Sequence, residues 1–587
     1  MVMPDEVYWR HDNWRKAQKE MVDDILDALN KKQHILCHAP TGMGKTDASL
    51  SAAISYALAN DLEVMFVTPK KSQHKMAMQV VDGLRAKYNL DFEAVDFVGR
   101  KDMCVNEDVL ELDNRDFYDV CQMLRTNTQK KEADLVEGGY CKPFKEGMCP
   151  YTEAMRRAAN ARVIIADYSY VFVPWISKVF LNATKKLLIN QIIIVDEAHN
   201  LRSRLLGALS YGVRSGTFSK ALDEMKLLKQ HYKDEKFRTF HKWANMKLKG
   251  EVEVKLTEKE IKGFFGEIDV AKLIDIGKRW IYKGGKRSAC LRIGEFFSLL
   301  GTIDDTYFTY LRRHENGYRM EIKCLDVSRV IGIANKAYAM IGMSGTFYPL
   351  NMYRDLFGLE RERTILKTYR SPFNAENRLN LLYTGATTLY EKRGEQEYSK
   401  IGGVISRCAD ATKGNVGVFF PSYEVLDGVI SYITTNRKMF VQRPDMKKQE
   451  TEKLINEFKS GSNGMLIGVQ GGSLSEGVDY DNGSLKCAII VGVALDHKSL
   501  EVSETIRLYD KLYLGKGKEY GYFYPAVNKA MQTAGRVIRK EDDRGVVVFI
   551  DKRFEMKCYR EGMPDDLVLW TTSNPEYFIK EFFDGKR

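Results

Sequence analysis

The sequence has 587 residues, of which 44% are hydrophobic and 29% charged, and it carries a formal net charge of +11. This length is too great for one hydrophobic core, so about three to five domains are expected. The composition is that of a globular protein, and no apolar run is long enough to span a bilayer. The positive charge is compatible with a polyanionic partner, or simply with a soluble surface.

The N-terminal residues Met-Val-Met-Pro-Asp-Glu show no charged segment followed by an apolar one, as a secretory signal would. Ten cysteines in a chain of this size argue against a disulfide framework. We therefore expect a cytoplasmic protein with no membrane partner.

A helix is expected to begin at residues 14–18. Arg15 and Gln18 lie just upstream of a phosphate-binding motif, from where a guanidinium and an amide can reach an adenine ring. A solvated helix face explains these two residues about equally well.

A phosphate-binding loop is predicted at residues 39–46, Ala-Pro-Thr-Gly-Met-Gly-Lys-Thr. The apolar run before it predicts a buried strand and the residues after it a helix, which is the context that such a loop requires. Gly42 and Gly44 allow the backbone to curl so that several N–H groups point at one anion. Lys45 would reach the β- and γ-phosphates of a nucleotide, and the Thr46 hydroxyl would bind Mg²⁺. The usual pattern begins with Gly rather than Ala, and an ordinary turn is the alternative.

Strand–helix alternation stops in a cysteine-containing segment at residues 100–151. Cys104, Cys121, Cys141 and Cys149 are separated by sixteen, nineteen and seven residues. No pair has the C-x₂₋₄-C spacing of a structural zinc site, whereas four separated thiolates suit a cubane iron–sulfur cluster. Four unrelated cysteines explain the spacing equally well. Basic and aromatic residues between them suit single-stranded nucleic acid, although a small metal-bound domain would need such aromatics merely to cover its metal.

Two acidic residues end a continuous aliphatic run at residues 192–195. Such a run predicts a parallel strand covered on both faces, with Asp196 and Glu197 at its carboxyl end, opposite the phosphate loop. Asp196 would hold Mg²⁺, and Glu197 would orient and deprotonate the attacking water. The alternative is an acidic pair that caps a helix.

Residues 212–324 are expected to form a mainly helical, basic insertion, because apolar residues recur there at helical spacing with Lys on the other faces. A second α/β unit follows, and residues 532–539 are expected to be helical. Arg536 and Arg539 would then share one helix face, either as a phosphate clamp or as part of a solvated surface. Buried strands of this unit are predicted at 417–420, 487–491 and 546–551.

The order of the motifs resembles that of the superfamily-two helicases. The chain carries in succession APTGMGKT, VTP, four cysteines, DEAH, MSGT, GGSLSEGVDY and QTAGRVIR. The cysteines between the phosphate loop and DEAH narrow the resemblance to the iron–sulfur helicases of the XPD family. Cys104 and Cys149 look like that family's first and last cluster ligands, whereas Cys121 and Cys141 are assigned by their order alone. The chain departs from the family at Asp167-Tyr168, where relatives often carry Asn-Tyr.

The resemblance implies an α/β fold with two RecA-like parallel-sheet motor domains. An iron–sulfur cluster insertion and a helical arch insertion would interrupt the first of them, and these three parts would enclose a pore for single-stranded DNA. The implied order is motor domain 1 (1–100), 4Fe–4S cluster domain (101–155), motor domain 1 (156–211), arch (212–324), motor domain 1 (325–372) and motor domain 2 (373–587).

By the same resemblance the protein is an ATP-dependent DNA helicase that moves 5′ to 3′ on single-stranded DNA and unwinds duplex in nucleotide excision repair. It would act as a monomer on single-stranded and forked DNA, with repair proteins as partners and with a 4Fe–4S cluster, ATP and Mg²⁺ as cofactors. The implied ATP and Mg²⁺ ligands are Arg15, Gln18, Thr41, Gly42, Met43, Gly44, Lys45, Thr46, Asp196 and Asp479. The implied catalytic set is Lys45, Asp196, Glu197, His199, Gln532, Arg536 and Arg539.

Two other functions stay open at this point. One is a DNA translocase that strips proteins from the strand without unwinding duplex. The other is an iron–sulfur redox sensor that binds DNA and retains a vestigial ATPase. A P-loop kinase is disfavoured because GGSLSEGVD and QTAGRVIR have no role in one.

Overall fold

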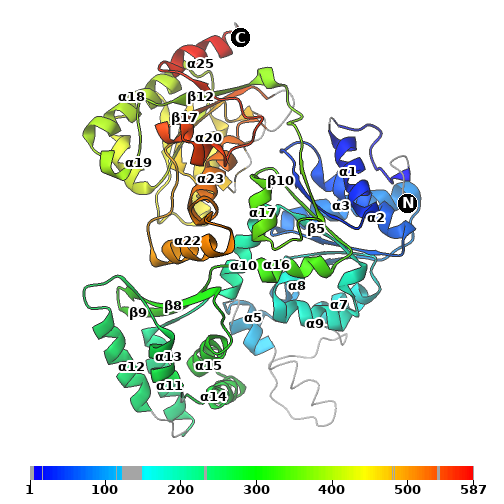
Figure 1. Ribbon diagram of the computed structural model, residues 1–587, viewed down its shortest axis with the longest axis vertical. Coiled ribbons are helices and arrows are strands. Elements are labelled where there is room, and N and C mark those ends of the chain that lie inside the picture. The colour runs from blue at the N-terminus through cyan, green and yellow to red at the C-terminus, as the bar shows by residue number, and fades with distance from the viewer. Residues whose placement is uncertain are drawn as a thin grey trace.

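Two large parallel sheets and one small antiparallel sheet make up the computed structural model (Figure 1). The structure describes residues 6–15, 17–113, 116–121, 149–229, 234–266, 268–476, 478, 480, 483–538 and 543–585. None of the helices formed by these residues combines the length and the apolar character needed to cross a membrane.

The first sheet has seven parallel strands in the order β11-β1-β10-β5-β2-β4-β3. Its central strands are buried along their whole length, as expected where helices cover both faces. Helices α1–α3 pack on one face, and α7–α10, α16 and α17 pack on the other. The strands are β1 (His34–His38), β2 (Glu63–Val67), β3 (Ala94–Phe97), β4 (Val163–Ala166), β5 (Gln191–Asp196), β10 (Ala339–Ser344) and β11 (Thr364–Thr368).

The helices of this domain are α1 (Gln18–Asn30), α2 (Lys45–Ala59), α3 (Lys71–Tyr88), α4 (Arg100–Met103), α5 (Glu107–Leu110), α7 (Pro150–Asn160), α8 (Ser169–Phe172), α9 (Pro174–Thr184), α10 (Leu201–Leu209), α16 (Ser328–Ile331) and α17 (Leu350–Leu356). Three short helical turns are η2 (Leu188–Asn190), η3 (Ala198–Asn200) and η4 (Gly332–Lys336).

The second sheet also has seven parallel strands, in the order β14-β15-β13-β16-β17-β12-β18. Two parallel-sheet α/β domains confirm the expected fold class. The strands are β12 (Arg378–Tyr383), β13 (Val416–Phe420), β14 (Lys438–Val441), β15 (Gly464–Val469), β16 (Cys487–Val491), β17 (Gly545–Ile550) and β18 (Trp570–Thr571). The helical elements are η5 (Ala375–Asn377), η6 (Tyr390–Lys392), α18 (Glu395–Ala411), α19 (Tyr423–Ile430), α20 (Lys448–Ser460), α21 (Ser473–Glu476), α23 (Tyr524–Ala534), η9 (Lys552–Glu555), α24 (Lys557–Arg560) and α25 (Pro575–Phe583).

The insertion between β5 and β10 contains strands that the sequence reading did not identify. Four antiparallel strands in the order β6-β9-β8-β7 pack against the helices of the insertion. They are β6 (Tyr211–Arg214), β7 (Glu253–Lys255), β8 (Tyr307–His314) and β9 (Gly317–Cys324), and the helices are α11 (Ser215–Leu227), α12 (Asp234–Lys247), α13 (Glu258–Phe265), α14 (Val270–Tyr282) and α15 (Ala289–Leu300). The expectation of helices was correct, but this module is mixed.

Helix α22 (Leu500–Leu512) and the π-helical turn η8 (Glu519–Phe523) leave the second domain and dock on the first. Tyr509 is fully buried and belongs to the apolar core of the first domain. Its hydroxyl oxygen accepts hydrogen bonds from Nε and Nη2 of Arg202 at 2.9 and 2.6 Å. Tyr513 donates to Oδ1 of Asp326 at 3.0 Å. This segment is therefore anchored to the domain that does not contain its sequence neighbours.

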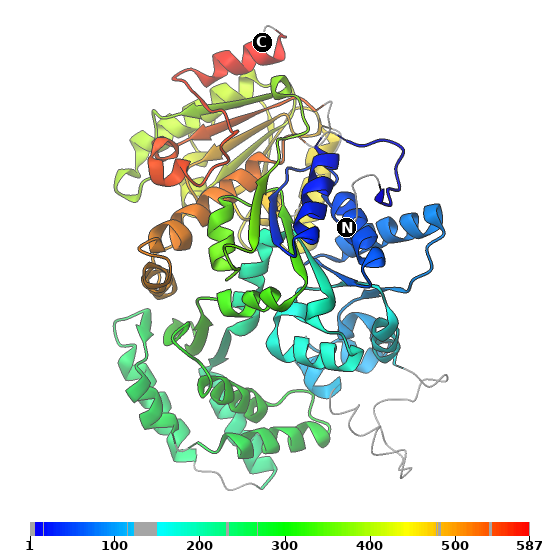
Figure 2. The ribbon, with the colours of Figure 1, turned by 45° about the vertical axis from the view of Figure 1, so that its right-hand side comes forward.

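The same helix also contacts the antiparallel insertion. Lys255 of β7 pairs with Glu504 at 2.8 Å, and Lys323 of β9 pairs with Glu501 at 3.3 Å. In both ribbon views α22 lies between the second sheet and strands β8 and β9 (Figures 1 and 2). Helix α22 thus joins three parts of the molecule.

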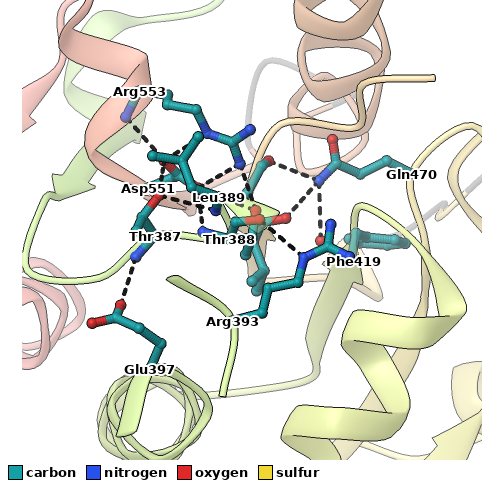
Figure 3. Close-up of polar contacts among 11 residues, drawn as sticks. Thr387, Thr388, Leu389, Arg393, Glu397, Phe419, Gln470, Asp551 and Arg553 are labelled. Carbon is teal, nitrogen blue, oxygen red and sulfur yellow. Dashed lines mark hydrogen bonds and ion pairs between the residues drawn. The ribbon is translucent and has the colours of Figure 1, made fainter. Parts of the chain in front are cut away.

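A buried ion pair closes the carboxyl end of β17 (Figure 3). Arg553 donates from Nε and Nη2 to the two carboxylate oxygens of Asp551, at 3.0 and 2.8 Å. The Thr388 backbone N–H donates to Oδ2 of Asp551 at 2.8 Å, and the Thr387 hydroxyl donates to Oδ1 at 3.0 Å. Burial alone would raise the pKa of Asp551, but the hydrogen bonds and the charge of Arg553 hold it below its ordinary value. The network fixes the loop after β12 to the end of β17.

Candidate nucleotide-binding site

The phosphate loop connects β1 to α2, as its sequence context predicts. Gly42 and Gly44 have φ angles of +86° and +79°, which glycine adopts without steric cost. Helix α2 begins at Lys45, so the amino-terminal end of a helix faces the loop. Met43 is fully buried and anchors the loop in the core. The described geometry is therefore suited to hold an anion.

Two side chains from the N-terminal segment hold the loop from outside. Arg15 donates from Nη1 to the Gly42 carbonyl at 3.2 Å, and Gln18 donates from Nε2 to the Gly44 carbonyl at 3.2 Å. Gln18 also accepts from the backbone N–H of Arg15 at 3.0 Å. Helix α1 begins at Gln18 rather than at residue 14, because Ala17 has a left-handed backbone with φ of +61°. Arg15 therefore does not lie on a helix.

The acidic pair lies where β5 ends. Tyr168 donates its hydroxyl to the backbone carbonyls of both Asp196 and Glu197, which fixes the backbone after the strand. Glu197 has a φ of +47°, a conformation that a residue other than glycine adopts only when its surroundings hold it. Ser344, the last residue of β10, donates to Oε2 of Glu197 at 3.2 Å. Nδ1 of His199 lies 2.6 Å from the same Ser344 hydroxyl.

The surroundings of the two carboxylates shift their pKa values in opposite directions. Burial and the charge of Glu197 raise the pKa of Asp196 to about 7, against the opposing effect of Lys45. Burial alone would raise the pKa of Glu197 too, but Lys45, His199 and the Ser344 hydrogen bond together lower it. Burial and nearby cations lower the pKa of His199, which favours the neutral imidazole. Glu197 is thus an ionised base at neutral pH.

Two residues of this domain, Asp196 and Thr46, carry oxygen donors suited to Mg²⁺. Asp196 is only 4% exposed, and burial together with the charge of Glu197 raises its pKa. Together with the Thr46 hydroxyl at the start of α2, it supplies the hard oxygen ligands that Mg²⁺ prefers, with waters and substrate phosphates completing an octahedron. The residues therefore fit this ion.

A cleft of about 1560 Å³ separates the two motor domains and is lined by both. Thr41, Glu197 and His199 line it from the first domain, and Gln532 and Arg536 line it from the second. Nε2 of Gln532 donates across it to the Thr346 hydroxyl at 3.4 Å. Five of the residues named from the sequence thus face one space.

Arg536 is held by its own domain. Its Nε donates to the Ser475 carbonyl at 2.9 Å and its Nη1 to the Val478 carbonyl at 3.1 Å. Helix α23 ends at Ala534, so Arg536 lies in the turn that follows. The expectation of a continuous helix through residue 539 was therefore wrong, and a shared helix face cannot pair the two arginines. Arg539 and Asp479 lie outside the residues that the structure describes.

The structure describes three of the four cysteines that the sequence suggests as cluster ligands. Cys104 follows α4, Cys149 precedes α7, and both are partly exposed, as is Cys121. Cys141 lies outside the described residues. Thiols are the right donors for iron, but within the described part of the chain no three side chains of metal-binding type converge on one point.

Sequence reasoning missed three residues of this region. Tyr168 and Ser344 support the acidic pair, as described above, and Phe373 lines the cleft from the segment between β11 and β12. Tyr168 and Ser344 each follow or end an aliphatic run, so their place at the carboxyl edge of the sheet was a usable signal. Phe373 lies in an irregular segment, and no local pattern identifies it.

Two family models match the chain. The model described as Type III restriction enzyme, res subunit, matches residues 11–240, and the Helicase C-terminal domain model matches residues 405–568.

Two named proteins resemble nearly the whole chain. The chain is 24% identical over 576 residues to ATP-dependent DNA helicase XPD of Sulfolobus acidocaldarius, which covers 94% of this chain and 98% of that protein. It is 23% identical over 712 residues to the helicase subunit XPD/RAD3 of general transcription and DNA repair factor IIH of Saccharomyces cerevisiae, covering 95% of this chain and 90% of that protein.

Solved structures share the fold. An XPD helicase structure matches with a TM-score of 0.68 and 21% identity, over 96% of this chain and 100% of that chain. The structure of S. tokodaii Xpd4 matches with a TM-score of 0.62 and 16% identity, over 95% of this chain and 100% of that chain.

Proposed function

The chain belongs to the XPD family of superfamily-two helicases, and we propose that it is an ATP-dependent DNA helicase. The relative from S. acidocaldarius is named an ATP-dependent DNA helicase, and the yeast relative a helicase subunit of a transcription and DNA repair factor. The observation that carries the proposal is the cleft, because Glu197 and His199 of one domain face the same space as Gln532 and Arg536 of the other.

In the proposed cycle the phosphates of ATP bind the backbone N–H groups of the phosphate loop, and Lys45 neutralises the β- and γ-phosphates. Mg²⁺ held by Thr46 and Asp196 would draw charge from the phosphate oxygens. Glu197 accepts a proton from the attacking water, since its lowered pKa keeps it ionised and Ser344 orients it. The first domain thus supplies the phosphate site and the base.

The second domain would complete the charge stabilisation. Arg536, whose Nε and Nη1 are held by the carbonyls of Ser475 and Val478, would contact the γ-phosphate as the cleft narrows. Its attraction to the γ-phosphate ends with hydrolysis, so ATP favours the closed state and ADP does not. The Gln532 hydrogen bond to Thr346 already spans the cleft and would report the same motion. Alternate closing and opening would move the two domains along single-stranded DNA.

Lys45→Ala tests the site. We expect this variant to bind single-stranded DNA like the wild type, while DNA-stimulated ATP hydrolysis falls at least about 100-fold. Unwinding of a forked duplex by the wild type, measured in parallel, separates a helicase from a translocase that only strips proteins. Normal ATP turnover in the variant would remove the site assignment.

The finer features of this function are inferred from the motif resemblance. They are 5′-to-3′ movement, nucleotide excision repair with repair proteins as partners, a cytoplasmic location, the domain boundaries given above, ATP contacts from Asp479 and Arg539, and a 4Fe–4S cluster on Cys104, Cys121, Cys141 and Cys149. Unwinding of 5′- and 3′-tailed duplexes tests the polarity. Iron content and the visible spectrum of protein purified without oxygen test the cluster.

A further inference from the structure

The aromatic ring of Phe373 covers the phosphate loop. Phe373 belongs to the segment 369–377, which joins β11 of the first domain to β12 of the second. A Cβ atom built on Gly42 would lie 2.4 Å from the ring Cζ and 2.9 Å from Cε1, so the ring is packed against the α-carbon of this glycine. The ring also packs on the apolar core of the second domain. It is a direct contact between that core and the loop.

The residues first considered for the adenine ring make other contacts. Arg15 and Gln18 donate to the carbonyls of Gly42 and Gly44, so they stabilise the loop itself. The amide group of Gln18 also fills the space above Gly44, where a Cβ would come within 2.2 Å of its nitrogen. These contacts assign both side chains a role in holding the loop.

Other aromatic rings line the same cleft but have different surroundings. His38 accepts a hydrogen bond from the Phe347 N–H at 3.2 Å, and Tyr348 lies edge-on to His38 with ring centroids 6.1 Å apart. Trp570 belongs to β18, the last strand of the second sheet. Among the described cleft residues, Phe373 is the aromatic one that covers a glycine of the phosphate loop.

We propose that Phe373 is the stacking surface for the base of the bound nucleotide. This inference rests on the proposed function and names the residue that supplies the base-dependent part of its affinity. Every base has a π face, so an aromatic ring favours a nucleotide over bare polyphosphate without reading a hydrogen-bond pattern. Because Phe373 lies on the segment between the domains, a base stacked on it would also fix that segment. Discrimination between adenine and guanine is then weak.

The test compares a ligand with a base and one without. Binding of ADP and of inorganic tripolyphosphate, each with Mg²⁺, is measured by calorimetry on the full chain. We expect Phe373→Ala to weaken ADP binding about 5- to 150-fold and to change tripolyphosphate binding less than about twofold. Phe373→Trp should retain ADP affinity, whereas Phe373→Leu, which keeps an apolar side chain, should resemble the alanine variant. Thermal unfolding of each variant verifies that it is folded.

Three results would overturn the inference. Equal weakening of both ligands would mean that Phe373 only supports the loop. Tighter binding of both by Phe373→Ala would mean that the ring blocks the site. Unchanged ADP affinity would mean that the base stacks elsewhere. The proposed function itself fails in a different way, namely if the wild type binds neither ligand or if Lys45→Ala binds both as well as the wild type does.

Discussion

Arg553→Leu should destabilise the second motor domain through the charge that it leaves behind. Asp551 is 0% exposed and Arg553 4% exposed, so water does not replace the lost guanidinium. The substitution removes two charge-assisted hydrogen bonds, at 3.0 and 2.8 Å, each worth roughly 1.5–3 kcal/mol. Bonds from Thr387 and Thr388 to the carboxylate remain and offset part of the cost.

The loss of one partner of a buried ion pair generally costs about 3–5 kcal/mol, and the remaining bonds favour the lower end of this range. For a domain of this size, each kcal/mol lowers the unfolding temperature by about 2–4 °C, so a decrease of roughly 10 °C is expected. The assay is thermal and urea unfolding of the full chain, followed by a signal from the second domain. The matched control is the double variant Asp551→Asn with Arg553→Leu, which removes the unpaired charge and should recover part of the stability.

The pH dependence gives an independent check. In the wild type the pKa of Asp551 is lowered, so its stabilising contribution is present above the unfolded pKa of about 3.9 and is lost as the pH falls through the folded pKa. In the Arg553→Leu variant the guanidinium no longer opposes the effect of burial, so the pKa of Asp551 rises. The deficit in unfolding free energy should then shrink as the pH is lowered from about 8 to about 5. A loss below about 1 kcal/mol, or a double variant as unstable as the single one, would refute the reasoning.

Three further predictions concern other parts of the molecule. Glu197→Gln should bind ATP normally but hydrolyse it about 100- to 10,000-fold more slowly. Equilibrium binding and steady-state turnover measure the two effects. Retention of about a tenth of the activity or more would contradict the role of Glu197 as the base. Tyr509→Phe leaves the partly buried Arg202 without its hydroxyl acceptor and should lower the unfolding free energy by about 2–4 kcal/mol, whereas Tyr577→Phe, at a side chain 57% exposed, should change it by less than about 0.5 kcal/mol. Cys104→Ser should lose iron, visible colour and duplex unwinding but keep some DNA-stimulated ATPase, and Cys558→Ser should retain them all; undiminished unwinding without iron would exclude a role for the cluster in strand separation.

The sequence predicted those parallel strands that are continuous aliphatic runs, but not strands of mixed composition such as β14 and β18. Ile35–Cys37, 192–195 and 546–550 all lie in buried strands of the two large sheets. The antiparallel strands were harder to predict, because they are interspersed among helices and because β8 ends in three charged or polar residues. The alternating residues of β9 were the one local signal, with a period of two.

Contacts between distant segments could not be read from the sequence. The ring of Phe373 touches a loop more than 300 residues earlier in the chain, and nothing in its neighbours' polarity encodes that. The end of α23 was predictable in principle, because Gly535 follows the last helical residue and glycine commonly ends helices. The two arginines beyond it were assigned to the helix on the strength of the motif. Local patterns thus identified strands and loops, whereas the packing of one domain on the other came only from the structure.

The docking of α22 limits how the two motor domains can move. The backbone passes between them three times: through residues 369–377, through residues 492–499 ahead of α22, and through α23. Within α23, Tyr524 belongs to the core of the first domain and Val527 to that of the second. Three connections restrict the relative rotation of the two domains more than a single connection would. Through its contacts, α22 would stay with the first domain and the insertion when the cleft opens.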